Sequence, residues 1–325
     1  MSTIPSNTAP APQPDRMDVA VETATRLGQV LLFDLRPLSG PLPAWQAGAH
    51  VDLFLGDGLI RQYSLCGDPA RQDRYRLAVL LEPDSRGGSK AVHAHVRPGA
   101  RLAIGAPRNL FPLHPGTGPA MLVGGGIGVT PLIAMAHALH DQGRDFVLHY
   151  VARNPVFAPL LRRTPFADRV RVHDRSRAEA PRFDPSGVLA DHAGTAGLSV
   201  YVCGPSGLME DVARAAGAAG IPPEDIHREA FSAQPVAAGR TFEVLAARAG
   251  LRVAVGGDEP ITTALARAGI RVPVSCEQGI CGTCVVTLLE GEADHRDSYL
   301  TDDERADQIA LCCSRARSPL LVVDL

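Results

Sequence analysis

The chain has 325 residues, of which 45% are hydrophobic and 21% charged, and its formal net charge is -3. This length suggests two or three domains, and the charge balance, without a basic run, argues against nucleic acid or an anionic membrane as a main partner. No apolar run is long enough to span a membrane and no signal peptide is indicated. We therefore expect a soluble cytoplasmic protein whose seven cysteines are ligands or free thiols rather than disulfides.

The first predicted elements are a flexible tail and a β domain. Residues 1–15 are rich in Pro, Ser, Thr and Ala, a composition that cannot bury enough surface to become ordered. From 16 to 112, Gly and Pro separate short strand-like runs such as Val30–Phe33, His50–Leu55 and Tyr75–Leu81. This pattern predicts an antiparallel barrel or sandwich.

Two motifs in this β domain suit a ligand with a flat ring and a phosphate. Arg61–Leu65 presents a guanidinium, a phenol and a hydroxyl, and Arg86–Lys90 gives a Gly-Gly-Ser turn before a helix-like segment. The first could hold the ring, and the second could hold an anion at the helix start. Each motif is weak alone, because Arg and Tyr in strands are more often surface residues and such a turn is usually only a turn.

Residues 113–231 alternate strands and helices, which predicts a βαβ nucleotide-binding unit. The strand Met121–Val123 runs into the Gly-rich turn Gly124–Pro131. A ligand could approach the backbone there, Thr130 could cap the following helix, and Pro131 suits its first position. A pyrophosphate would lie at the helix N-terminus. The turn does not match Gly-x-Gly-x-x-Gly, and tight packing alone is the other interpretation.

The ends of the next two strands leave the choice between NADH and NADPH open. A ribose-binding acid is expected after the second strand, yet Arg153 stands there, and the third strand ends in His173–Arg177. Arg175 and Arg177 could hold a 2′-phosphate. Alternatively, these two arginines belong to a solvated loop, and Asp174 beside them favours NADH.

A linker and a third domain complete the chain. Residues 232–240 lack periodicity, which predicts an interdomain linker ahead of 241–325. In this last part Cys276, Cys281 and Cys284 have the Cys-x4-Cys-x2-Cys spacing of a plant-type ferredoxin, which holds a 2Fe–2S cluster. Glycines in the run let the loop aim backbone N–H groups at the sulfurs.

Two questions about this cysteine site stay open. A zinc site or unconnected buried thiols are the alternatives, although structural zinc sites usually have two Cys-x2-Cys pairs or Cys together with His. The fourth ligand is Cys312 or Cys313. Because adjacent residues of an extended segment point to opposite faces, only one of them can reach the iron, and the pattern does not choose between them.

In their order along the chain, these motifs, together with Tyr201–Pro205 and Glu229–Phe231, resemble the phthalate dioxygenase reductase and vanillate demethylase reductase family. The resemblance covers about Asp18 to Leu325, and its specificity lies in the combination and in the C-terminal place of the ferredoxin domain. The implied fold is multidomain α/β plus β. Its parts are an antiparallel FMN-binding β-barrel at 16–112, a ferredoxin-reductase-like parallel α/β NAD(P)-binding domain at 113–231, and a C-terminal β-grasp 2Fe–2S ferredoxin domain at 241–325.

The resemblance also implies roles for individual residues. The flavin-binding set is Arg61, Gln62, Tyr63, Ser64, Gly87, Gly88 and Ser89. The nucleotide-binding set is Gly125, Gly126, Gly128, Thr130, Pro131, Cys203, Gly204 and Pro205, to which the strand ends add Arg153 and Asp174. The catalytic set is Ser64, Cys203 and Phe231, with Phe231 closing the flavin face. The metal ligands are Cys276, Cys281, Cys284 and Cys312.

The implied activity is that of an NADH-dependent reductase component, with NADPH not excluded, which passes electrons through FMN and the cluster to a terminal Rieske-type aromatic oxygenase or O-demethylase. NADH gives two electrons together, whereas an oxygenase takes them singly, and a flavin can do both. The alternatives are a reductase for a cytochrome P450 or another one-electron acceptor, and a non-catalytic iron–sulfur redox sensor. The chain has no Cys-x-His pair, so it is not itself a Rieske protein.

Overall fold

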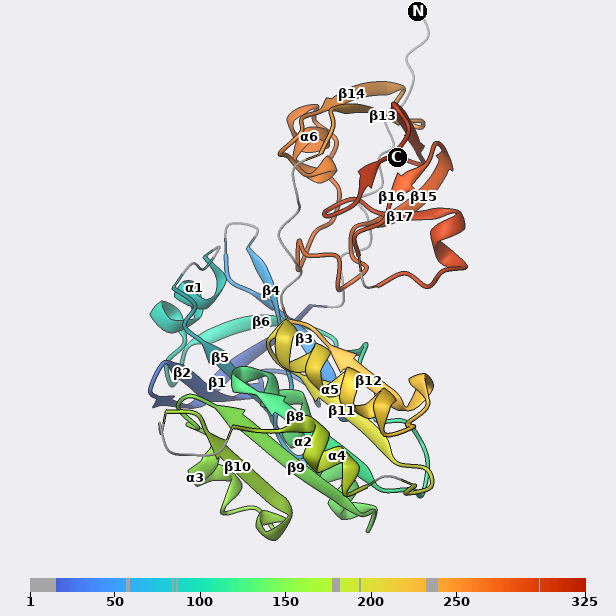
Figure 1. Cartoon of the computed structure of the whole chain (residues 1–325). Helices are drawn as coiled ribbons and strands as arrows, with labels where there is room; N and C mark the ends of the chain where they lie inside the picture. The colour runs from blue at the N-terminus through green and yellow to red at the C-terminus, as the bar shows by residue number, and fades with distance from the viewer. Residues whose placement is uncertain are drawn as a thin grey trace, which may run out of the picture. The chain divides into compact units, whose positions relative to one another are not determined.

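The computed structural model describes residues 16–56, 59–83, 85, 87–176, 182–192, 194–231, 239–297 and 299–325 (Figure 1). The predicted tail 1–15, most of the predicted linker 232–240, Arg86 and Arg177 lie outside the described residues. The described residues divide into two compact units: 18–102 with 107–231 form one, and 239–325 with 16–17 and 103–106 form the other. The boundaries of the three expected domains stay predictions.

The N-terminal part of the chain forms an antiparallel sheet that closes on itself. Its strands are β1 (Arg16–Leu27), β2 (Val30–Pro37), β3 (Ala49–Phe54), β4 (Ile60–Ser64), β5 (Tyr75–Leu80), β6 (Arg101–Gly105) and β7 (Arg108–Asn109). They lie in the order β4-β3-β6-β1-β2-β5, with β7 paired to β3. Beyond β4, Leu65 pairs with Leu77 of β5, which joins the two ends of the sheet into a barrel. Val19, Phe33 and Leu53 are fully buried in it, and helix α1 (Gly88–His95) follows β5.

The next part of the chain forms a five-stranded parallel sheet with helices. The strands are β8 (Ala120–Gly125), β9 (Phe146–Ala152), β10 (Val170–Asp174), β11 (Ser199–Cys203) and β12 (Ile226–Glu229). The helices are α2 (Val129–Asp141), α3 (Ala158–Leu161), α4 (Pro185–Ala190) and α5 (Ser206–Ala218), with 3-10 turns η1 (Gly126–Gly128), η2 (Ala167–Arg169) and η3 (Pro223–Asp225).

The strand order of this parallel sheet indicates where a ligand is expected to bind. The order is β10-β9-β8-β11-β12, so the direction of winding reverses between β8 and β11. Both of these strands are buried along their whole length, as expected for a sheet with helices on its faces. Open α/β sheets bind ligands at the carboxyl ends of the strands where the winding reverses. The loops after β8 and β11 therefore mark the expected site.

The C-terminal part is a mixed sheet crossed by one helix. Its strands are β13 (Phe242–Ala246), β14 (Leu251–Val255), β15 (Val285–Glu290), β17 (Gln308–Ala310) and β19 (Leu320–Val323), with the helix α6 (Ile261–Arg267), the 3-10 turn η4 (Glu304–Ala306) and a small pair, β16 (Ala293–Asp294) and β18 (Arg315–Ala316). The order β14-β13-β19-β15-β17, with α6 packed through Leu265 on Val244 and Val323, is a β-grasp.

A buried arginine ties the start of this β-grasp part to its interior. The guanidinium of Arg315 donates hydrogen bonds to the backbone oxygens of Glu259 (2.6 Å), Arg240 (2.8 Å) and Gly256 (2.8 Å). It also lies over the ring of Phe242, 4.9 Å from the ring centroid. The charge is thus satisfied by carbonyl groups and an aromatic face rather than by an acid.

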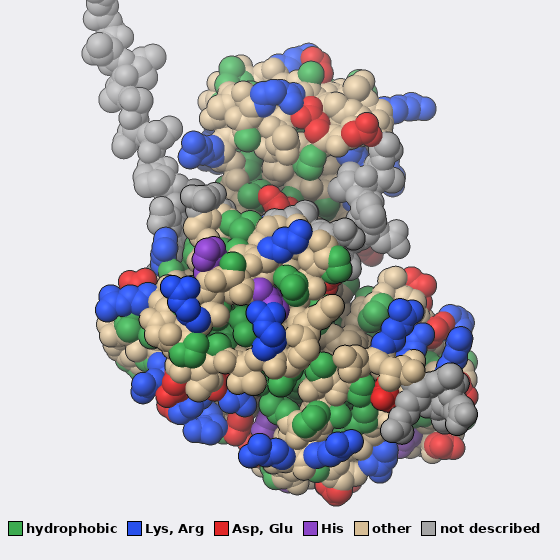
Figure 2. Space-filling view, turned by 90° about the vertical axis from the view of Figure 1, so that its left-hand side faces the viewer, with side chains coloured by type: hydrophobic (Ala, Val, Ile, Leu, Met, Phe, Trp, Pro, Cys, Tyr) green, Lys and Arg blue, Asp and Glu red, His purple; other side chains and the backbone are tan. Residues whose placement is uncertain are grey.

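The structure confirms the predicted fold class, with an antiparallel barrel, a parallel α/β sheet and a C-terminal β-grasp. In the described part of the chain no helix is long and apolar enough to cross a membrane. On the face shown in Figure 2, basic and acidic side chains are interspersed, in keeping with the net charge of -3.

Candidate redox site

The Arg61–Ser64 motif lies on β4, at one end of the barrel sheet and antiparallel to β3. Because side chains alternate along a strand, Arg61 and Tyr63 share one face, and Gln62 and Ser64 share the other. Burial raises the pKa of Tyr63 to about 12, although the nearby Arg61 guanidinium opposes the rise. The phenol therefore stays neutral and offers an uncharged aromatic surface next to a fixed positive charge.

The Gly87–Ser89 turn lies against Arg61. A Cβ atom added at Gly88 would lie 2.5 Å from Cγ of Arg61, so only glycine leaves room for the arginine. Gly87 has a φ of 91°, and helix α1 begins directly after it with no side chain capping its first turn. The Ser89 hydroxyl accepts a hydrogen bond from the backbone N–H of Glu82 at 3.1 Å. The guanidinium and the uncapped helix start form a cradle that suits a phosphate.

The two loops at the switch point touch through their backbones. A Cβ atom at Gly125 would lie 2.7 Å from Cδ of Pro205, and one at Gly204 would lie 2.8 Å from Cα of Gly125. A Cβ atom at Gly128 would lie 2.5 Å from the backbone oxygen of Cys203. Tight packing therefore accounts for three of the predicted glycines. Gly126 differs, because its φ is 58° and nothing lies within 4 Å of an added Cβ atom, which leaves room for a ligand.

The predicted cap of helix α2 is wrong. The 3-10 turn Gly126–Gly128 runs directly into the helix, which begins at Val129. Thr130 is therefore already inside the helix, and its hydroxyl donates to the backbone oxygen of Ile127 at 2.9 Å. Pro131 is the third helical residue rather than the first. No side chain caps the first turn, and the N–H group of Val129 donates to the backbone oxygens of Gly126 and Ile127. The positive end of the helix dipole there suits an anion such as a pyrophosphate.

Cys203 and Glu229 end the neighbouring parallel strands β11 and β12 and are paired in register. Burial raises the pKa of the Cys203 thiol well above its ordinary value, and the charge of Glu229 adds to the rise. Burial raises the pKa of Glu229 to about 8, and its Oε2 atom is buried with no hydrogen-bond partner among the described residues. At pH 7 both groups hold their protons. Phe231, two residues further on, is 39% exposed.

Glu229 is the residue that sequence reasoning missed. The Glu229–Phe231 motif contributed to the family resemblance, but no role was predicted for its acid. The available signal was an acidic residue at the end of a strand in a sheet expected to be buried. Such an acid is costly unless it is paired or neutral, and is therefore a candidate for function.

The ends of β9 and β10 bring Arg153 and Asp174 to the same edge of the sheet, because Asp174 pairs in register with Ala152. The Asp174 carboxylate closes a turn, since its Oδ1 atom accepts from the Ser176 backbone N–H at 2.9 Å and hydroxyl at 2.7 Å. Arg153 is exposed. Both charges lie where a ribose is expected, so the choice between NADH and NADPH stays a prediction.

The four predicted metal ligands come together in the β-grasp part. Their thiols are buried, and Cys276 contacts Cys281 and Cys312, while Cys312 also contacts Cys284. The contacts with Cys281 and Cys312 lower the pKa of Cys276. Contacts thus link the four thiols in the order Cys281, Cys276, Cys312 and Cys284. In the described part of the chain no group of three His, Cys, Asp or Glu side chains is arranged to hold a single metal ion.

Backbone N–H groups point at three of these sulfurs, as predicted. The donors are Gln278 to Cys276 (3.3 Å), Gly279 to Cys312 (3.3 Å) and Cys312 to Cys284 (3.4 Å). The loop needs left-handed backbone at Glu277 (φ 54°), Gly279 (φ 72°) and Gly282 (φ 72°) to turn around the sulfurs. Such donors stabilise negative charge on the ligands and fit an iron–sulfur cluster.

The geometry supports Cys312 rather than Cys313 as the fourth ligand. The sulfur of Cys312 contacts two other predicted ligands and accepts from Gly279. The thiol of Cys313 instead faces the backbone oxygen of Ala310 at 3.7 Å. It also lies beneath the loop, since a Cβ atom at Gly279 would be 2.5 Å from its sulfur.

The barrel, the parallel sheet and the four-cysteine β-grasp together define an electron-transfer oxidoreductase. Residues 246–317 match the family described as a 2Fe-2S iron-sulfur cluster binding domain. Over 298 residues the chain is 46% identical to the vanillate O-demethylase oxidoreductase of Pseudomonas sp. (strain HR199 / DSM 7063), covering 90% of this chain and 93% of the relative.

Two solved structures are similar over nearly the whole chain. Phthalate dioxygenase reductase, described as a modular structure for electron transfer from pyridine nucleotides to 2Fe-2S, has a TM-score of 0.75 at 34% identity and covers 96% of this chain and 98% of its own. An intact type IV self-sufficient cytochrome P450 monooxygenase has a TM-score of 0.79 at 36% identity and covers 98% of this chain and 43% of its own. The chain therefore belongs to the vanillate O-demethylase oxidoreductase and phthalate dioxygenase reductase family, which confirms the predicted resemblance.

Proposed function

We propose that this chain is the NADH-dependent reductase component of a Rieske-type aromatic oxygenase or O-demethylase system. The observation that carries the proposal is the group of four neighbouring thiols, three of which accept hydrogen bonds from backbone N–H groups. The same chain has a phosphate cradle on its barrel and a nucleotide loop on its parallel sheet. The similarity to a vanillate O-demethylase oxidoreductase supports an oxygenase partner.

In this proposal the barrel holds FMN. The cradle of Arg61 and the start of α1 suits the single phosphate of that flavin, because Gly88 lets the arginine lie against the turn. Tyr63 shares a face with Arg61 and offers a neutral ring for the flavin to lie against. Bound flavin supplies the exchange between a two-electron hydride and single electrons.

The nucleotide lies across the switch point of the parallel sheet. Its pyrophosphate occupies the space beside Gly126 and the uncapped start of α2. The nicotinamide then lies near Cys203 and Glu229, whose retained protons keep the pocket uncharged. Ser64 and Phe231 complete the proposed catalytic set. We favour NADH, with Asp174 on the ribose, and the seven buried cysteines suit the reducing cytoplasm.

A second candidate acceptor is a cytochrome P450. The observation that favours it is the similarity of the whole chain to part of a self-sufficient P450 monooxygenase. The two candidates need the same flavin and cluster and differ only in the protein that takes the electrons. Rates of electron delivery to a purified Rieske oxygenase and to a purified P450, measured side by side, separate them.

The first experiment is an anaerobic titration of the purified protein with NADH, with flavin and iron–sulfur absorption followed together. Bleaching of both bands at comparable NADH supports the path from nicotinamide through flavin to cluster. A flavin that stays oxidised with NADH but bleaches with NADPH reverses the choice of nucleotide. A flavin that stays oxidised with both would favour the redox-sensor alternative.

A further inference from the structure

Asp297 is a buried carboxylate in the β-grasp part, and the electron path proposed above does not use it. Its side chain has no exposed surface. Its Oδ2 atom accepts hydrogen bonds from the backbone N–H groups of Tyr299 at 3.2 Å and Leu300 at 2.8 Å. Removing a carboxylate from water is costly, and these bonds offset the cost only in part. The position of the side chain therefore calls for an explanation.

Asp297 lies against one end of the cysteine loop. A Cβ atom at Gly279 would lie 2.9 Å from Cα and 3.0 Å from Cβ of Asp297, so the loop packs on this residue with no side chain between. The N–H group of the same Gly279 donates to Cys312 Sγ at 3.3 Å. A shift of Asp297 would move Gly279 and change this N–H···S hydrogen bond.

Asp297 also controls the other end of the loop, through Tyr299. The ring of Tyr299 lies over Gly282, where a Cβ atom would overlap the ring atoms. Gly282 stands between Cys281 and Cys284, and its φ is 72°. Tyr299 is 38% exposed, so the position of its ring depends largely on its backbone. That backbone is held by the carboxylate of Asp297.

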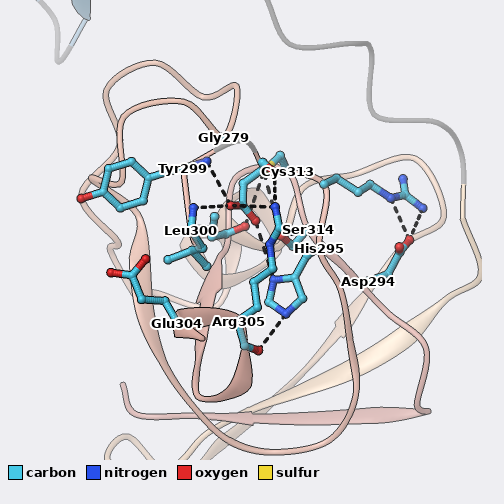
Figure 3. A network of polar contacts seen from close by, with 12 residues as sticks. Gly279, Asp294, His295, Tyr299, Leu300, Glu304, Arg305, Cys313 and Ser314 are labelled. Atoms are coloured by element: carbon cyan, nitrogen blue, oxygen red, sulfur yellow. Dashed lines mark hydrogen bonds and ion pairs between the residues drawn. The ribbon is translucent and has the colours of Figure 1, made fainter. Parts of the chain in front are cut away.

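Two basic side chains, Arg305 and His295, lie beside Asp297, and both are labelled in Figure 3. Arg305 Nη2 donates to the backbone oxygen of Asp297 at 2.9 Å and lies 4.0 Å from its Oδ2 atom. His295 Nδ1 lies 3.7 Å from Oδ1 of Asp297, and its Nε2 atom is 3.1 Å from the backbone oxygen of Arg305. The carboxylate is thus held through its Oδ2 atom by two backbone N–H groups, while its Oδ1 atom is buried with no hydrogen bond among the described residues.

We propose that Asp297 is a positioning residue for the cluster: it packs against Gly279 and, through its carboxylate, holds the Tyr299 ring over Gly282, and in this way it sets the reduction potential. Hydrogen bonds to the sulfurs and nearby charge are the levers by which a protein tunes such a cluster. The inference rests on the proposed 2Fe–2S function and adds Asp297 as the residue that adjusts the reduction potential of the cluster.

The test compares Asp297→Asn and Asp297→Ala with the control Asp307→Asn, which removes the same charge from an exposed residue of the same segment. For each full-length protein the cluster content, the EPR spectrum of the reduced cluster and its midpoint potential are measured. Asp297→Asn keeps an oxygen acceptor but loses the charge, so the EPR spectrum is retained while the reduced-to-oxidised ratio at fixed potential rises roughly tenfold, or about 59 mV. Asp297→Ala alters the EPR spectrum as well, and Asp307→Asn changes neither.

Wild-type potential and EPR spectrum in both Asp297 variants would overturn the proposal. If both variants lose the cluster, Tyr299→Ala replaces them, since it removes the ring from Gly282 and leaves the carboxylate in place. An altered EPR spectrum of Tyr299→Ala supports the proposal, and an unchanged one overturns it. The wild-type protein separates the two possible failures. If the proposed function is wrong, the wild type itself lacks the 2Fe–2S signal. NADH–ferricyanide activity should be equal in all variants, because it reports on the flavin.

Discussion

Gly128 allows a sharp test of the nucleotide site, because alanine suits its backbone but not its surroundings. Its φ of -63° and ψ of -5° are ordinary for any residue. An added Cβ atom would lie 2.5 Å from the backbone oxygen of Cys203 and 2.6 Å from its carbonyl carbon. Backbone atoms cannot rotate away, so the loops after β8 and β11 must separate. Overpacking of this kind costs about 1–3 kcal/mol, which corresponds to about 5- to 150-fold in an equilibrium constant.

We expect Gly128→Ala to raise the KM for NADH within that range, measured by steady-state reduction of ferricyanide. Flavin content and the spectrum of the dithionite-reduced cluster should not change. The control is Gly207→Ala on α5, where an added Cβ atom meets nothing within 4 Å and alanine favours the helix. A wild-type KM in Gly128→Ala, or an equal rise in Gly207→Ala, would refute the steric argument.

Four further substitutions test the redox groups. Cys281→Ser should abolish electron delivery from NADH to a one-electron protein acceptor and leave ferricyanide reduction largely intact; equal loss of both in a folded, flavin-bound variant contradicts this division. Cys312→Ser should lose the visible absorption of the cluster and Cys313→Ser should keep it, whereas the opposite result makes Cys313 the ligand. Glu229 has its pKa raised from 4.5 to about 8 in the folded state, so its contribution to stability is full below pH 4.5 and is lost as the pH rises through 8. Urea unfolding of Glu229→Gln should therefore depend less on pH across this window than that of the wild type, and parallel profiles would contradict the assignment.

The parts of the site that are local in sequence could be predicted from it. The spacing of Cys276, Cys281 and Cys284 reflects one loop, and the loop has the predicted N–H groups directed at its sulfurs. The choice between Cys312 and Cys313 could not be made from the spacing of the cysteines. It depends on which thiol the Gly279 N–H group reaches, across 33 residues of sequence.

Other features depend on tertiary structure and were missed for that reason. The strand-like runs predicted an antiparallel barrel or sandwich, but the barrel closes only through the pairing of Leu65 with Leu77. The cap predicted for Thr130 failed because a 3-10 turn extends the helical conformation ahead of Val129, which residue preferences do not reveal. The protonated state of Glu229 follows from burial at the end of a strand, and burial is a property of the folded sheet.

The anchoring of Arg315 bears on how this β-grasp part can be joined to other chains. Its guanidinium holds the backbone of Arg240, where the chain enters the fold, to Gly256 and Glu259. The entry point is therefore fastened from within, by a side chain of the same fold. A connecting segment upstream can then lengthen or shorten at a cost of only about 0.6 kcal/mol for each doubling of a flexible loop. The fastening residue stands three positions after Cys312, so the segment that anchors the entry point of the chain also carries a proposed ligand of the cluster.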